Sequence, residues 1–151
     1  MTSNNAVNEI LDFAIRGEEE ARDFYNDLAS KLKNPSMKVI FEEFAAEEDN
    51  HRAKLLEVRA SGEFSFHAEQ VQDLKIADYL VVEPPKGELD YQQALVIAMK
   101  KEKKAFQMYT KLSESAKDEA IRDLFAFLAQ EEAKHKLRIE LEYDDVVLSE
   151  N

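Results

Sequence analysis

Apolar residues recur every three or four positions in four separate stretches of the chain, which is the spacing of one face of an amphipathic α-helix. The first two stripes are Leu11, Ala14, Glu18, Ala21, Tyr25, Leu28, Leu32 and Phe41, Phe44, Glu48, His51, Leu55, Val58. The other two are Tyr91, Leu95, Ala98, Glu102, Ala105, Tyr109, Leu112 and Ile121, Phe125, Leu128, Glu132, His135, Ile139. The pattern predicts four helices of similar length, each with polar residues in the middle of its apolar face.

The boundaries of these helices carry recognisable start signals. Asn34 and Pro35 lie between the first and second stripes, where Asn suits an N-cap and Pro suits the first helical position. Asp90 is followed three residues later by Gln93, which is the spacing of a capping box. The second and third stripes are therefore expected to start close to these residues.

The glycines and prolines mark a connector in the middle of the chain, because four of the six lie between Gly62 and Gly87. We therefore expect one domain, residues 1–151, with a hairpin at 4–61, a crossover at 62–89 and a second hairpin at 90–143. The crossover has 28 residues, which reach ~90 Å when extended. A helix of ~25 residues is ~38 Å long, so the crossover can run along the helices. The segment from His67 to Leu80 is predicted to include a short helix.

The two halves of the chain repeat each other without a gap. Adding 84 to a residue number converts Leu11, Ala14, Glu18, Ala21, Tyr25, Leu28, Phe41, Glu47, Glu48 and His51 into the same residue type in the second half. Such an internal repeat indicates a duplicated helical hairpin. Two hairpins that face each other make an all-α four-helix bundle, the fold class that we expect.

The glutamates of the stripes are predicted to meet within each hairpin. Glu18 and Glu48 are equally far from position 33, and Glu102 and Glu132 are equally far from position 117, where the hairpin turns are expected. Each glutamate is then ~22 Å from its turn. His51 and His135 follow one helical turn after Glu48 and Glu132, on the same face.

Carboxylates that are buried among Phe and Leu repel one another. The loss of their hydration also costs several kcal/mol per ion, so they need cations beside them. Two divalent cations balance four carboxylates, and two neutral imidazoles complete the ligand set. The chain has no cysteine, which excludes zinc-thiolate and iron-sulfur sites. A single Glu-x-x-His in so acidic a chain suits a solvated helix face, but the duplicated set at one depth indicates a dinuclear metal site.

The chain resembles the rubrerythrin-like branch of the ferritin-like di-iron carboxylate superfamily. The resemblance lies in four segments, GEEEARDFY (17–25), EEDNH (47–51), KEKKAFQMY (101–109) and QEEAKH (130–135). In di-iron bundles of this kind, two helices each supply a Glu and the other two each supply a Glu-x-x-His motif. It implies that Glu48 and Glu132 bridge two metals, that Glu18 and Glu102 bind terminally, and that His51 and His135 take one metal each. Iron is expected, although manganese and zinc use the same ligand types.

The resemblance also implies an activity. It indicates a non-haem di-iron oxidoreductase, a peroxidase that reduces hydrogen peroxide or dioxygen through the metals held by the four glutamates. Tyr25 and Tyr109 are expected to donate hydrogen bonds to the ligand carboxylates. Without a rubredoxin-type centre, electrons must come from an external donor protein, and the family favours a homodimer. Two other functions stay open: a ferroxidase or iron-handling protein, and a metal-stabilised structural module.

Details of the sequence limit these expectations. Rubrerythrins carry a further glutamate about one turn after the third-helix ligand, whereas Ala105 and Phe106 stand there in this chain. His67, in the connector, is expected at the surface or in packing rather than as a ligand.

The charge of -12 argues against binding to nucleic acid. The N-terminus lacks the features of a signal peptide and no apolar run suits a membrane span, so a soluble cytoplasmic protein is expected.

Overall fold

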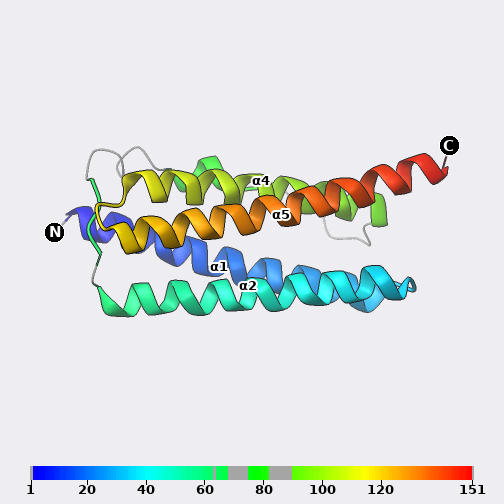
Figure 1. Ribbon diagram of the computed structural model, residues 1–151, viewed down its shortest axis with the longest axis horizontal. Helices are drawn as coiled ribbons and strands as arrows, with labels where there is room; N and C mark the ends of the chain where they lie inside the picture. Colours follow the sequence, from blue (N-terminus) through cyan, green and yellow to red (C-terminus); the bar gives the residue numbers. More distant parts are fainter. Residues whose placement is uncertain (1, 63, 68–74, 82–89, 151) are drawn as a thin grey trace. The chain divides into compact units, whose positions relative to one another are not determined.

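The computed structural model describes residues 2–62, 64–67, 75–81 and 90–150, and these residues are helical for most of their length. The elements are α1 (Thr2–Lys31), α2 (Pro35–Ser61), the 3-10 helix η1 (Ile76–Tyr79), α4 (Tyr91–Ser115) and α5 (Glu119–Glu150), as Figure 1 shows. The described residues contain no β-strand. Four long helices therefore lie where the four stripes predict them.

The chain divides into two compact units, Met1–Asp73 and Leu74–Asn151. In the first unit α1 packs against α2, and in the second α4 packs against α5. Each pair is a helical hairpin joined by a short turn (Figure 1). No helix in the described part of the chain has the length and apolar character that a membrane span needs.

The first hairpin begins and ends its second helix at the predicted residues. The side-chain oxygen of Asn34 accepts hydrogen bonds from the backbone N–H of Ser36 at 2.9 Å and of Met37 at 3.4 Å. Pro35 is the first helical residue, where its missing N–H costs nothing. Gly62 ends α2 with a φ of 62°, a left-handed conformation that glycine adopts without strain.

The second hairpin begins with the predicted capping box. The Asp90 carboxylate accepts a hydrogen bond from the Gln93 N–H at 2.7 Å, and the Gln93 side-chain oxygen accepts one from the Asp90 N–H at 3.1 Å. At the other end of α4, the Ser113 hydroxyl donates to the Arg122 carbonyl at 2.8 Å. That bond ties the end of α4 to the first turn of α5.

The interior of each hairpin reproduces the repeat of the sequence. Leu11, Tyr25, Phe41 and Leu55 are at most 1% exposed, as are their counterparts 84 residues later, Leu95, Tyr109, Phe125 and Ile139. The rings of Tyr25 and Phe41 stack with centroids 5.8 Å apart at 14°, and those of Tyr109 and Phe125 stack at 6.2 Å and 17°. The two hairpins are therefore built around the same packing unit.

The end of α5 differs from the sequence-based expectation, and a short helix in the crossover agrees with it. The second hairpin was expected to end at residue 143, but α5 continues to Glu150, because no glycine or proline follows Gly87 to stop it. Within the predicted crossover the described residues form one short helix, η1, which lies inside the expected segment from His67 to Leu80. Residues 68–74 and 82–89 of the crossover lie outside the described part.

Replacing Asp90 with Ala is expected to lower the free energy of unfolding of the metal-free protein by about 1 kcal/mol, because the first turn of α4 loses its cap. Urea unfolding followed by circular dichroism measures the change. Asp123→Ala is the matched control, since Asp123 is exposed on α5 and makes no hydrogen bond or ion pair with the described residues. Equal effects of the two substitutions would contradict the capping role.

Candidate metal centre

The first unit brings three of the predicted ligand residues together. Glu18 projects from the middle of α1, and Glu48 and His51 project from α2. The Nδ1 atom of His51 lies 3.5 Å from Oε2 of Glu18 and 3.4 Å from Oε1 of Glu48. The ligand atoms of the three residues lie within 4.8 Å of one another. All three side chains are 3% exposed or less, so this cluster is enclosed.

The second unit contains the corresponding cluster. Glu102 comes from α4, and Glu132 and His135 come from α5. The His135 Nδ1 atom lies 3.6 Å from Oε1 of Glu102, and ligand atoms of the three residues lie within 4.8 Å of one another. Each residue is 2% exposed. The two clusters thus contain all six residues that the sequence predicts as ligands.

The reason that these side chains meet is the register of the hairpins. Residues equally far from the turn lie side by side in a tight antiparallel helical hairpin, and Glu18 and Glu48 satisfy this condition, as do Glu102 and Glu132. The histidines lie one turn along, on the face that carries the glutamates. Local helix geometry and a turn of the right length are therefore enough to form each cluster.

The donor set fits a metal ion by geometry. An ion held at about 2.1 Å by two ligand atoms, with an angle of about 110° between them, keeps those atoms about 3.4 Å apart. The measured separations between histidine nitrogen and carboxylate oxygen are 3.4, 3.5 and 3.6 Å. Both histidines also present the same nitrogen, Nδ1, to the carboxylates. One ion in each cluster is consistent with all three separations.

The donor set also fits a metal ion by charge. Each cluster places two carboxylates, nearly free of solvent, beside one imidazole. Two carboxylates this close repel each other, and burial penalises their charge further. One divalent cation in each cluster would neutralise its two carboxylates, with the imidazole as a further ligand. Oxygen and imidazole donors of this kind suit iron, manganese or zinc.

The tyrosines that were predicted to support the ligands are buried in the core. Tyr25 and Tyr109 are each 1% exposed, and their rings stack on Phe41 and Phe125. Both lie two turns from a ligand glutamate on the same helix, seven residues after Glu18 and after Glu102. The hydrogen bonds from their hydroxyls to the ligand carboxylates stay a prediction.

An ion-pair network beside the first cluster was not foreseen from the sequence. The Arg22 Nη1 atom on α1 lies 2.8 Å from Oδ1 of Asp49 on α2, and the Arg52 Nε atom lies 3.1 Å from the same oxygen. Arg52 also approaches Glu19 of α1 at 3.9 Å. Hydrogen bonds from Arg22 and then Arg52 lower the pKa of Asp49. The network joins the two helices next to the ligands, and the only sequence signal was the spacing of Asp49 and Arg52.

The corresponding positions of the second hairpin do not form this network. Phe106 and Ala133 stand where the repeat has Arg22 and Asp49. Lys136, the counterpart of Arg52, instead donates to Glu140 on its own helix at 2.6 Å. The repeat therefore extends over the buried face of each hairpin and is lost on the outer face.

Two helical hairpins with duplicated Glu, Glu and His clusters define a helical metal-binding protein of the carboxylate type. The family profile for rubrerythrin matches residues 9–143, and the chain belongs to this family. No curated protein is similar enough to count as a match.

Two solved structures are similar to the chain. One is a hypothetical protein from Pyrococcus furiosus, 28% identical, with a TM-score of 0.69 over 91% of this chain and 87% of that one. The other comes from Thermotoga maritima and is described as a ferritin-like diiron-carboxylate protein; it is 22% identical, with a TM-score of 0.76 over 93% and 95% of the two chains. The expected fold class, a ferritin-like four-helix bundle made of two hairpins, is confirmed.

Replacing His51 with Ala is expected to remove one tightly bound metal ion per chain, because the first cluster keeps only its two carboxylates. Elemental analysis of metal-loaded, desalted protein measures the change. The matched control is His67→Ala, since His67 is exposed and lies outside both clusters. Equal metal content in the two variants would contradict the assignment of His51.

Proposed function

We propose that this protein is a non-haem di-iron oxidoreductase that reduces hydrogen peroxide or dioxygen with electrons from an external donor. The observation that carries the proposal is the buried cluster of two glutamates and one histidine, present once in each hairpin. Membership of the rubrerythrin family supports it. Iron is the metal proposed, and Glu18, Glu48, Glu102 and Glu132 are the residues through which the metals would act.

We propose further that the two clusters act as one dinuclear centre. The chain supplies four carboxylates and two imidazoles, which balance two divalent ions rather than one. The resemblance to the family supports Glu48 and Glu132 as the bridging ligands, with Glu18 and Glu102 as terminal ligands. When bound, two Fe(II) ions supply the two electrons that convert a peroxide and two protons into two water molecules.

The six proposed ligands are 3% exposed or less, so the surrounding residues cover them from solvent. The stacked pairs Tyr25 with Phe41 and Tyr109 with Phe125 lie in the buried core of each hairpin, two turns from Glu18 and Glu102. A buried phenol hydroxyl needs a partner, and a ligand carboxylate is a strong acceptor. A hydrogen bond to the outer oxygen of a ligand carboxylate would fix its orientation.

We propose that the electrons come from outside these 151 residues. These 151 residues contain no cysteine, so they provide no iron-sulfur or rubredoxin-type centre. Each peroxide reduced would call for two electrons from that source. A redox protein that docks on the surface is the expected donor.

Catalytic turnover tests the proposal against its two alternatives. Iron-loaded protein, reduced without oxygen and then mixed with hydrogen peroxide, is expected to consume peroxide over many cycles when a reductant is supplied. Ferric product that accumulates beyond two irons per chain, without such cycles, would favour a ferroxidase. The absence of both would favour a metal-stabilised structural module.

A matched pair of glutamate variants controls this experiment. Glu132→Ala is expected to abolish turnover and the binding of a second metal ion per chain, because the proposed bridging ligand is lost. Glu42→Ala removes an exposed carboxylate that lines neither cluster and is expected to leave turnover unchanged. Two tightly bound ions in Glu132→Ala would contradict the bridging role.

Replacing Tyr25 or Tyr109 with Phe is expected to lower metal affinity or turnover by roughly 10- to 100-fold, the usual effect of losing a partner of a metal ligand. The aromatic ring and its stacking remain in either variant. Metal titration and peroxide consumption measure the effect. Tyr143→Phe is the control, because Tyr143 is a half-buried tyrosine of α5 outside both clusters. Wild-type behaviour of both core variants would assign these tyrosines to packing alone.

A further inference from the structure

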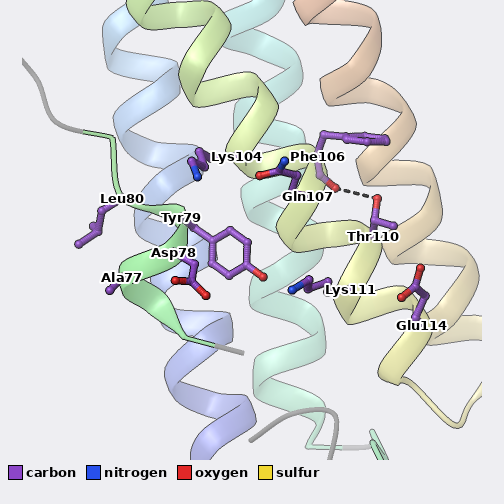
Figure 2. A pocket seen from close by; sticks show the side chains of 10 residues that line it. All are labelled: Ala77, Asp78, Tyr79, Leu80, Lys104, Phe106, Gln107, Thr110, Lys111 and Glu114. Carbon is purple, nitrogen blue, oxygen red and sulfur yellow. Dashed lines mark hydrogen bonds between the residues drawn. The ribbon is translucent and has the colours of Figure 1, made fainter. Parts of the chain in front are cut away.

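A second candidate site lies on the second unit, away from the metal ligands. A cavity of about 610 Å³ opens between η1 and α4 (Figure 2). Lys104, Gln107 and Lys111 line it from α4, and none of the six ligand residues does. At 3.6 residues per turn these three positions lie roughly 140° to 200° around the helix from Glu102. The volume is in the range of pockets that bind small molecules.

The hydroxyl of Tyr79 is the buried polar group of this cavity. Tyr79 is 7% exposed and lies on η1, with its ring against α4 and its oxygen directed between the two elements (Figure 2). The oxygen is buried and has no hydrogen-bond partner within the described part of the chain. Burial and the nearby charge of Asp78 raise the pKa of Tyr79, so the hydroxyl keeps its proton. It is therefore a donor that faces the cavity and finds no acceptor among the described residues.

The electrostatic character of α4 favours an anion. Among the four long helices α4 alone has a positive net charge, with five lysines and two glutamates. The others have more acidic than basic residues, in a chain whose formal charge is -12. Lys104 and Lys111 lie two turns apart on one side of α4, about 10.5 Å along the axis. Within the described residues neither lysine forms an ion pair.

The cavity also offers hydrogen-bond acceptors. Asp78 and Glu114 contribute carboxylates to its lining. Thr110 donates its hydroxyl proton to the Phe106 carbonyl at 2.8 Å, so its oxygen can only accept from a ligand (Figure 2). A ligand that satisfies this lining therefore needs hydroxyl donors as well as an anionic group.

We propose that this cavity binds a small anionic polyol, a sugar phosphate or a sugar acid. Its anionic group would lie between Lys104 and Lys111 and accept a hydrogen bond from Tyr79. Its hydroxyl groups would donate to Asp78 and Glu114. The site does not depend on the proposed redox function, because no metal ligand contributes to it.

Calorimetric titration of the full chain with four probes tests the proposal and separates the two sources of the anion. Glucose 6-phosphate or gluconate, or both, is expected to bind saturably with one molecule per chain. Glucose, which lacks the anion, and inorganic phosphate, which lacks the polyol, are expected to bind at least tenfold more weakly. Failure of both anionic polyols, or equal binding of inorganic phosphate as an adventitious ion only, would overturn the proposal.

Substitutions in the lining locate the binding. Tyr79→Phe and Lys104→Met are each expected to weaken binding by about tenfold or more, because a hydrogen bond or ion pair to a charged ligand is lost. Lys38→Met, which removes an exposed lysine of α2, is the control and is expected to leave binding unchanged. Binding that is unaffected by Tyr79→Phe and Lys104→Met would overturn the location.

The stability of the ligand-free Tyr79→Phe variant is an independent check. Since the hydroxyl makes no hydrogen bond in the described part of the chain, its removal is expected to leave the melting temperature unchanged or raise it. A lower melting temperature would show that the hydroxyl already has a partner within the protein, and would contradict its role as a ligand donor.

Discussion

The burial of four carboxylates inside apolar helical hairpins is the constraint on which the rest of the structure depends. Each of Glu18, Glu48, Glu102 and Glu132 is 3% exposed or less, and an unneutralised carboxylate in such surroundings costs several kcal/mol. The arginines beside the first cluster, Arg22 and Arg52, pair with Asp49 on the outer side of the hairpin. A divalent metal ion would neutralise the two carboxylates of each cluster, and the imidazole beside them is a further donor that suits such an ion.

This constraint explains which parts of the repeat are preserved. The stacked Tyr and Phe pair and the Glu, Glu and His cluster recur 84 residues apart, with ring separations and ligand distances that agree within a few tenths of an ångström. The outer positions differ, since Phe106 and Ala133 replace Arg22 and Asp49. Positions that hold the ligands are tied to one geometry. The outer face of α4 is not bound to this geometry. It carries the lysines and forms the cavity with η1.

The sequence predicted the buried features well because they follow from helix periodicity and turn position. Glu18 and Glu48 meet because both are the same distance from the turn at Asn34 and Pro35, and the same holds for Glu102 and Glu132. Contacts on exposed faces are different, since the approach of Arg22 to Asp49 depends on side-chain rotamers that spacing does not determine. The position of Tyr79 was equally hard to foresee, because the crossover has no period that assigns a side chain to a face.

The charges around the clusters bear on whether iron is a resident cofactor or a substrate in transit. A ferrous ion in transit, like any cation, is guided along a path lined by free carboxylates or other negatively charged groups. Beside the first cluster the seam between α1 and α2 carries Arg22 and Arg52, 28% and 29% exposed, and both pair with Asp49, so this carboxylate is engaged in ion pairs. Beside the second, Lys134 pairs with Glu131 and Lys136 pairs with Glu140 on the outer side of α5. Enclosed ligands whose neighbouring carboxylates are engaged in ion pairs suit a metal that stays bound, which is what the proposed oxidoreductase requires and a ferroxidase does not.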